Sequence, residues 1–300
     1  MILVLFLFMP LLQAAQPPAT SSYVPQRVYD THKKAFTDFE TMLADLGRAA
    51  VVFVGEQHDD RNTHRLELAM LEGLKRRRTP LVVAMEMFER DVQPAIDRYA
   101  SGESTEEEFL RAARPWPRYA TDYRPSVEFA RANQIPIVAS NVPRRIASDV
   151  AKAGMSALDS LSDARRLAAA EIRCPAKGDY YDRFLASMRE HPSRGSAIPP
   201  SADSNRFYLA QCVKDETMGE SVAETLRTAR DARTAIVHIN GSFHTDFGQG
   251  TVESTRRRLP GRRVIVLSIL PVDDLDAARP VKEDRKRADY LVYTTKQSGN

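Results

Sequence analysis

Five short apolar runs recur along the chain, and each gives way to polar residues before a segment with helical spacing begins. The runs are 49–55, 80–88, 135–140, 234–241 and 262–269. Continuous apolar runs of this length are typical of strands that are buried on both faces. Because strands and helices alternate, the sequence predicts an α/β fold with a mainly parallel sheet flanked by helices.

Helical segments are expected between these strands, from the spacing of their apolar residues and their basic or glycine-containing ends. They are 61–78, 91–112 with a break at "SGEST", 126–133, 144–153 and 251–258. A longer helical insertion, 154–232, separates the third and fourth strands. Its middle, 190–204, has no helical or strand pattern, and its length indicates a mobile loop or lid.

The N-terminal stretch 1–22 differs from the rest and is interpreted as a signal peptide and linker. Residues 2–12 are apolar over about the length of a signal-peptide core, which is too short to span a bilayer. Cleavage near Ala15 would leave a mature chain that starts near Gln16. No basic residue precedes the apolar run, which departs from the usual pattern.

The remaining chain is predicted to form one α/β domain over 23–271, followed by an extension over 272–300. The segment 288–295, "ADYLVYTT", is expected to add a strand at the edge of the sheet.

Charge and cysteine content restrict the function classes. The chain carries 43 basic and 40 acidic residues, so its net charge of +3 gives no support for a nucleic-acid-binding protein. The local basic excess at 256–263 is read as a solvated helix end and loop, with an anion-binding patch as the alternative. Cys174 and Cys212 could pair in an oxidising compartment or remain two buried thiols, and their spacing fits no zinc motif.

Polar residues gather where the predicted strands end. Glu56 and His58 follow the first strand, Glu86 lies within the second, and His244 follows the fourth in "HINGSFH". Because ligands bind at the carboxyl ends of parallel strands, we expect these four side chains to share one site. Further polar candidates at the same edge are Asn141, Arg144 and Asn240.

Two carboxylates and two imidazoles support two kinds of chemistry. They could ligate a divalent metal, or one imidazole could act as a general base that a carboxylate orients. The remaining histidines are predicted to have other roles: His64 on the exposed side of a helix, His191 in the irregular loop, and His238 in the core. Gly55 is expected to let a ligand approach the backbone.

Several motifs together resemble a known family. They are "VVFVGEQHDDRNTHRLELAMLEGL", "VVAMEMFERDVQPAIDRY", "IPIVASNVPRR", "DETMGESVAETL" and "HINGSFHTDFGQG". In this order they resemble the ChaN-like haem-binding uptake proteins of the Tiki superfamily, over roughly residues 30–270. That superfamily also includes the Tiki metalloproteases and relatives of erythromycin esterase.

The resemblance implies an exported protein, periplasmic or cell-surface associated, that binds haem non-covalently between two protomers and holds the iron with tyrosine. It further implies a homodimer and an outer-membrane haem uptake system as partners. The segment "PWPRYATDYRP" contains the candidate cofactor-binding residues: Tyr119 or Tyr123 as iron ligand, Trp116 to stack on the porphyrin, and Arg118 and Arg124 to pair with its propionates.

Two alternatives remain open. The first is a metal-dependent hydrolase of the Tiki or erythromycin esterase-like type that uses Glu56, His58, Glu86 and His244. The second is a partner-binding module that has kept the fold and lost the site. The chain also departs from the family's frequent lipoproteins, because no cysteine follows the apolar N-terminal run.

Overall fold

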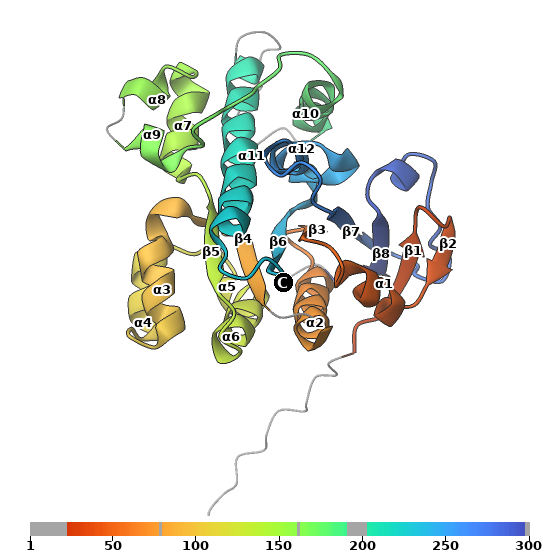
Figure 1. Ribbon diagram of the computed structural model, residues 1–300. Helices are drawn as coiled ribbons and strands as arrows, with labels where there is room; N and C mark the ends of the chain where they lie inside the picture. Colours follow the sequence, from red (N-terminus) through yellow and green to blue (C-terminus); the bar gives the residue numbers. More distant parts are fainter. Residues whose placement is uncertain (1–22, 78–79, 161–162, 191–202, 298–300) are drawn as a thin grey trace, which may run out of the picture.

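A single eight-stranded sheet organises the computed structural model, which describes residues 23–77, 80–160, 163–190 and 203–297 (Figure 1). The strand order is β2-β1-β8-β7-β3-β6-β4-β5. All pairs from β8 to β5 are parallel, whereas β1 pairs antiparallel with both β2 and β8. The predicted α/β fold with a mainly parallel sheet is therefore confirmed. The strands are β1 Gln26–Asp30, β2 Ala35–Thr37, β3 Val51–Glu56, β4 Leu81–Glu89, β5 Ile137–Asn141, β6 Ala235–Gly241, β7 Val264–Val272 and β8 Tyr290–Thr295.

The end of the sheet formed by β1, β2 and β8 differs from the sequence prediction. Strands β1 and β2 were not predicted, because they are short and mix polar with apolar residues. Strand β8 lies between β7 and β1, so it is inside the sheet and not at its edge. The predicted signal peptide and linker, 1–22, lie outside the described residues.

Helices cover both faces of the sheet (Figure 1). One face packs against α1 Phe39–Leu46, α2 Arg61–Arg77, α3 Gln93–Ser101, α4 Glu106–Ala113, α5 Tyr119–Asp122 and α6 Arg124–Ala132. The other face packs against α11 Asp203–Thr228 and α12 Thr251–Arg258. Alternate residues of β3 face opposite cores, with Val52 and Val54 on the first face and Val51 and Phe53 on the second. Among the described residues, no helix combines the length and apolarity needed to cross a bilayer.

The segment between β5 and β6 is helical, as predicted. It contains α8 Ala157–Ser160, α9 Ala164–Leu167, α10 Asp179–Glu190 and the long α11. Helices α8 and α9 join α7 Arg144–Ala153 and α11 in a third apolar cluster. Residues 191–202, which include His191 and most of the predicted loop, lie outside the described residues. The described part of the chain also contains four short 3-10 helices: η1 Arg90–Val92, η2 Ser242–His244, η3 Asp246–Gly248 and η4 Asp284–Lys286.

The two cysteines form a disulfide. Cys174, in the segment before α10, is bonded to Cys212 on α11, with their Cα atoms 5.8 Å apart. Of the two alternatives for this pair, the structure therefore has the disulfide. The bond ties the insertion to the helix that covers the second face of the sheet.

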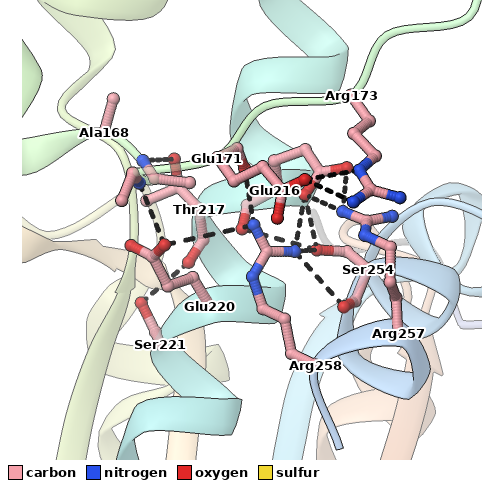
Figure 2. Close-up of polar contacts among 12 residues, drawn as sticks. Ala168, Glu171, Arg173, Glu216, Thr217, Glu220, Ser221, Ser254, Arg257 and Arg258 are labelled. Carbon is pink, nitrogen blue, oxygen red and sulfur yellow. Dashed lines mark hydrogen bonds and ion pairs between the residues drawn. The ribbon is translucent and has the colours of Figure 1, made fainter.

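A polar network attaches α12 to α11 (Figure 2). Glu216 of α11 is buried, and it accepts hydrogen bonds from Arg257 at 2.5 Å and from Arg258 at 2.6 Å. Arg258 also donates to the carbonyl of Glu171 at 2.6 Å. Its side chain is only 7% exposed, so the prediction of a solvated basic helix end is wrong for this residue. The arginines instead neutralise a buried carboxylate.

Candidate functional site

The carboxyl end of β3 presents an acid and an imidazole that are bonded to each other. Glu56 is fully buried, and its Oε1 accepts hydrogen bonds from His58 Nδ1 and, at 3.1 Å, from the hydroxyl of Tyr123. The His58 side chain is 45% exposed, so an imidazole that solvent can reach is bonded to a buried carboxylate. Burial raises the pKa of Glu56, but the neighbouring His58 and His64 outweigh burial and leave the pKa below its usual range.

Two glycines bring η2 against the ends of β3 and β6. A Cβ on Gly55 would lie 3.0 Å from Ser242 Cα, so the space at this glycine is filled by the chain's own backbone and not by a ligand. A Cβ on Gly241 would lie 2.8 Å from His58 Nε2 and 3.6 Å from Glu86 Oε2. Glycine at 241 therefore allows His58 and Glu86 to approach each other.

Glu86, His244 and Asp215 form a second group, hereafter the outer triad. The Nε2 of His244 lies 3.2 Å from Glu86 Oε1, and its Nδ1 lies 2.7 Å from Asp215 Oδ1. The Gly241 N–H donates to Glu86 Oε2 at 2.8 Å, and the hydroxyl of Thr251 donates to Asp215 at 2.9 Å. Every member of the triad is buried. The structure thus brings Glu56, His58, Glu86 and His244 to one edge of the sheet.

In the outer triad, both carboxylates act on the protonation of one imidazole, that of His244. Burial alone would lower the pKa of His244, but Glu86 and Asp215 raise it to about 10. Burial would raise the pKa of Glu86, but His244 and His58 lower it to about 2. His244 is therefore an imidazolium at neutral pH and holds a proton that it would have to lose before acting as a general base.

A third group, hereafter the inner cluster, consists of Glu56, His64 and Glu67. His64 Nδ1 lies 3.2 Å from Glu56 Oε2 and 3.2 Å from Glu67 Oε2. All three are buried, so the prediction that His64 lies on the exposed side of its helix is wrong. The buried stripe of α2 is polar in its first turns, where it packs under the end of β3, and becomes apolar later.

The inner cluster also has two acids for one imidazole, but both acids lie at the same ring nitrogen. Burial lowers the pKa of His64, but Glu67 and Glu56 raise it to about 11. Burial and the charge of Glu56 raise the pKa of Glu67 well above its ordinary value. Burial beside the charge of Glu56 thus favours the protonated form of Glu67.

The other polar residues predicted at the strand ends make hydrogen bonds within the sheet. Asn141 Nδ2 donates to the Glu86 carbonyl at 3.1 Å, and Asn240 Nδ2 donates to the Gly241 carbonyl at 2.8 Å, so both support the strand ends. His238 lies in the core, as predicted, bonded to Ser140 and Asn240. Burial lowers its pKa to about 4.

The predicted cofactor-binding tyrosines lie in the interior. Tyr119 and Tyr123 are buried, burial raises the pKa of both hydroxyls, and the Tyr119 hydroxyl has no hydrogen-bond partner among the described residues. Arg118 pairs with Asp122 at 2.9 Å, and Arg124 is bonded to Glu106, so both guanidinium groups are already engaged.

A cavity of about 650 Å³ lies between the segment 114–117 and the start of α7. Its wall includes Trp116, Arg114, Arg144 and Arg145, and the Trp116 ring is 5.1 Å from the His58 ring. Arg114 is bonded to Glu89 and Asp91, and Arg145 to Asp163. Arg144 is exposed and makes no hydrogen bond or ion pair to any residue that the structure describes. The cavity volume is within the range of small-molecule and cofactor sites.

These features define an α/β protein with a polar site at the carboxyl edge of a mostly parallel sheet and an aromatic, arginine-lined cavity beside it. The family model described as "Haem-binding uptake, Tiki superfamily, ChaN" matches residues 42–254. The chain belongs to this family, as its motifs indicated.

One solved structure of this family shares the fold, and a second structure is less similar. The structure described as "Cofacial heme binding to ChaN of Campylobacter jejuni" has a TM-score of 0.65 at 16% identity, covering 90% of this chain and 97% of that one. An erythromycin esterase mutant in its open conformation has a TM-score of 0.46 at 14% identity, covering 91% and 83%.

A curated relative comes from a plant. "Protein RETICULATA-RELATED 5, chloroplastic" of Arabidopsis thaliana is 22% identical over 275 residues, which are 86% of this chain and 36% of that protein. The chain therefore spans about a third of that relative's length.

Proposed function

We propose that this protein binds haem non-covalently in the cavity lined by Trp116 and Arg144, at an interface between two copies, and that it acts in haem uptake outside the cytoplasm. The proposal rests on the lining of this cavity. Trp116 offers an aromatic ring that can stack on a porphyrin, and Arg144 offers a guanidinium group that can pair with a propionate. Family membership supplies the cofactor, since this family is described as haem-binding.

Arg144 is our candidate for the propionate contact, in place of Arg118 and Arg124. Arg144→Ala should weaken haemin binding about tenfold, because a charge-assisted bond to a carboxylate contributes on the order of 1.5 kcal/mol. Arg145→Ala is the matched control, since its guanidinium lines the same cavity but is bonded to Asp163. Equal losses in the two variants would contradict the assignment.

Iron ligation by Tyr119 or Tyr123 requires the segment 115–124 to open, because both hydroxyls are buried. The exposed alternative as iron ligand is His58, whose ring contacts Trp116 of this segment. Absorption spectra of haemin complexes decide between them: tyrosinate and imidazole ligation give different ferric spectra. Tyr119→Phe, Tyr123→Phe and His58→Ala then identify the ligand, and the absence of any saturable spectrum in the wild type overturns the haem proposal.

The dimer and the export route have separate tests. Light scattering of the protein with and without haemin should report a haem-dependent dimer.

Protein recovered outside the cytoplasm should start near Gln16, and the Cys174–Cys212 disulfide supports this location because such bonds persist in oxidising compartments. Protein with an intact N-terminus found only in the cytoplasm contradicts export.

A hydrolase is the second candidate, and one observation favours it. His244 is oriented by Asp215 and lies against Glu86, near the exposed His58, which is an arrangement suited to polarising a carbonyl group. The raised pKa values of His58 and His244 argue against either as a base at neutral pH. Turnover of an ester or peptide that His58→Ala and His244→Ala abolish, in haem-free protein, would establish this function.

A further inference from the structure

The interior below His58 contains carboxylate oxygens that the protein leaves without hydrogen bonds. Glu56 Oε2 and Glu67 Oε1 are buried and have no hydrogen-bond partner among the described residues. Both residues are only 1% exposed. Buried carboxylate oxygens are rarely left in this state, because the loss of their hydration is costly unless a donor or a cation replaces it.

The hydrogen bonding of His64 shows which ring nitrogen carries a hydrogen and which one faces the carboxylates. Its Nε2 lies 3.2 Å from the carbonyl oxygen of His58, which can only accept, so Nε2 carries a hydrogen. Asp122 Oδ2 lies 3.6 Å from the same nitrogen. Nδ1 therefore points at two carboxylate oxygens at once, those of Glu56 and Glu67, each 3.2 Å away.

We propose that Glu56, His64 and Glu67 form a buried binding site for a divalent transition cation such as Zn²⁺. Two ligand atoms that lie about 2.0–2.1 Å from a tetrahedral zinc ion are about 3.3 Å from each other. Both distances from His64 Nδ1 match this separation. One ligand atom from each of the three residues lies within 4.8 Å of the others, so a single ion can reach all three.

Asp122 completes the arrangement as an orienting residue. A metal-bound histidine commonly donates its second ring N–H to a carboxylate or carbonyl, which fixes its tautomer. His64 Nε2 donates to the His58 carbonyl, and the Asp122 carboxylate, which Arg118 holds at 2.9 Å, lies 3.6 Å from the same nitrogen.

The site is distinct from the four-residue set predicted from the sequence, which has two imidazoles and includes His58 and His244. It shares only Glu56, whose Oε1 holds His58 while Oε2 faces the inner cluster. A cation here would fix the Glu56 carboxylate and thereby the ring of His58. This inference does not depend on haem binding.

Metal content tests the site directly. The full chain, unfolded with a chelator and refolded with Zn²⁺ or with Mn²⁺, should retain one equivalent of metal after dialysis. Glu67→Gln keeps the shape of the side chain and should bind at least tenfold more weakly. Glu86→Gln is the matched control from the outer triad and should retain the metal.

A spectroscopic measurement keeps the test independent of how the variants fold. X-ray absorption of the zinc-loaded wild type should show one imidazole nitrogen among oxygen ligands. Two imidazoles, loss of metal in Glu86→Gln but not in Glu67→Gln, or a wild type that retains no metal would each overturn the proposal. None of these results bears on the haemin spectra, so the two proposals fail separately.

Discussion

The outer triad and the inner cluster each place one histidine between two carboxylates at the same edge of the sheet, yet they differ in how hydrogen bonds satisfy those carboxylates. In the outer triad each ring nitrogen of His244 has its own acid, and each acid receives further donors. In the inner cluster one nitrogen of His64 faces two acids, and oxygens of both lack hydrogen bonds. The first group is complete within the protein, whereas the second requires an additional proton or cation.

The difference follows from how the groups are built. The outer triad takes Glu86 from β4, Asp215 from α11 and His244 from η2, so each acid approaches the ring from its own direction. The inner cluster takes His64 and Glu67 from adjacent turns of α2, which places them on the same side of Glu56. Separate elements can therefore surround an imidazole in a way that one helix cannot.

Removal of the cation from the outer triad should have the largest effect. His244→Leu leaves Glu86 and Asp215 buried without their common partner, and breaking a buried ion pair in this way costs about 3–5 kcal/mol. Urea unfolding of the haem-free protein at pH 7 measures this loss. A change below about 1 kcal/mol would mean that His244 does not compensate the two buried carboxylates.

Opening the disulfide should come next. The loop between Cys174 and Cys212 spans 38 residues, and its closure is expected to stabilise the protein by about 4 kcal/mol. Cys174→Ser with Cys212→Ser should also disturb the outer triad, because Tyr180 of the tethered segment is bonded to Asp215. Proton NMR of the histidine rings should show a shifted His244 and an unchanged His64. The reverse pattern would contradict this coupling.

The pH dependence of stability gives a smaller effect. The pKa of His244 is raised from 6.5 to about 10, so its contribution is complete below pH 6.5 and declines as the pH rises toward 10. The pKa of Glu86 is lowered to about 2, so its contribution is complete above pH 4.5 and declines toward pH 2. The wild type should therefore lose on the order of 2 kcal/mol relative to His244→Leu between pH 6 and pH 9. If the difference in unfolding free energy between the wild type and His244→Leu stayed constant over this range, the raised pKa of His244 would be refuted.

The smallest effect is expected in the inner cluster without metal. Glu67→Gln removes one of two neighbouring buried acids, so it should change the free energy of unfolding by less than about 1 kcal/mol or raise it. Glu86→Gln, the matched change in the outer triad, should cost more because it removes a partner of His244. If the two substitutions cost the same, the contrast between the groups does not exist.

The sequence predicted those parts of the site that follow apolar strands. Glu56, His58, Glu86 and His244 stand out because they interrupt or end apolar runs. Asp215 was missed because it lies in the middle of a long helix, where a single acid has no such contrast.

His64 and Glu67 were missed for a related reason, although a signal was present. Together with Leu71 and Leu74 they have the i, i+3, i+7, i+10 spacing of one helical stripe, and that stripe faces the core. The apolar residues alone define a narrower stripe, and by that pattern the polar residues of the helix are expected to face solvent. The strands β1 and β2 could not be found in this way, because their partners, and not their own composition, make them strands.

The pairing of β1 with β8 has a consequence for the order of folding. Gln26 lies opposite Thr294, so the strand that connects β1 and β2 to the rest of the sheet is contributed from the far end of the sequence. Contacts between segments so distant form slowly, because a long loop must close before they contribute. The parallel strands from β7 to β5 can assemble without them. The β2-β1-β8 end of the sheet should thus close last, and a chain that is still being synthesised would hold the polar site before its sheet is complete.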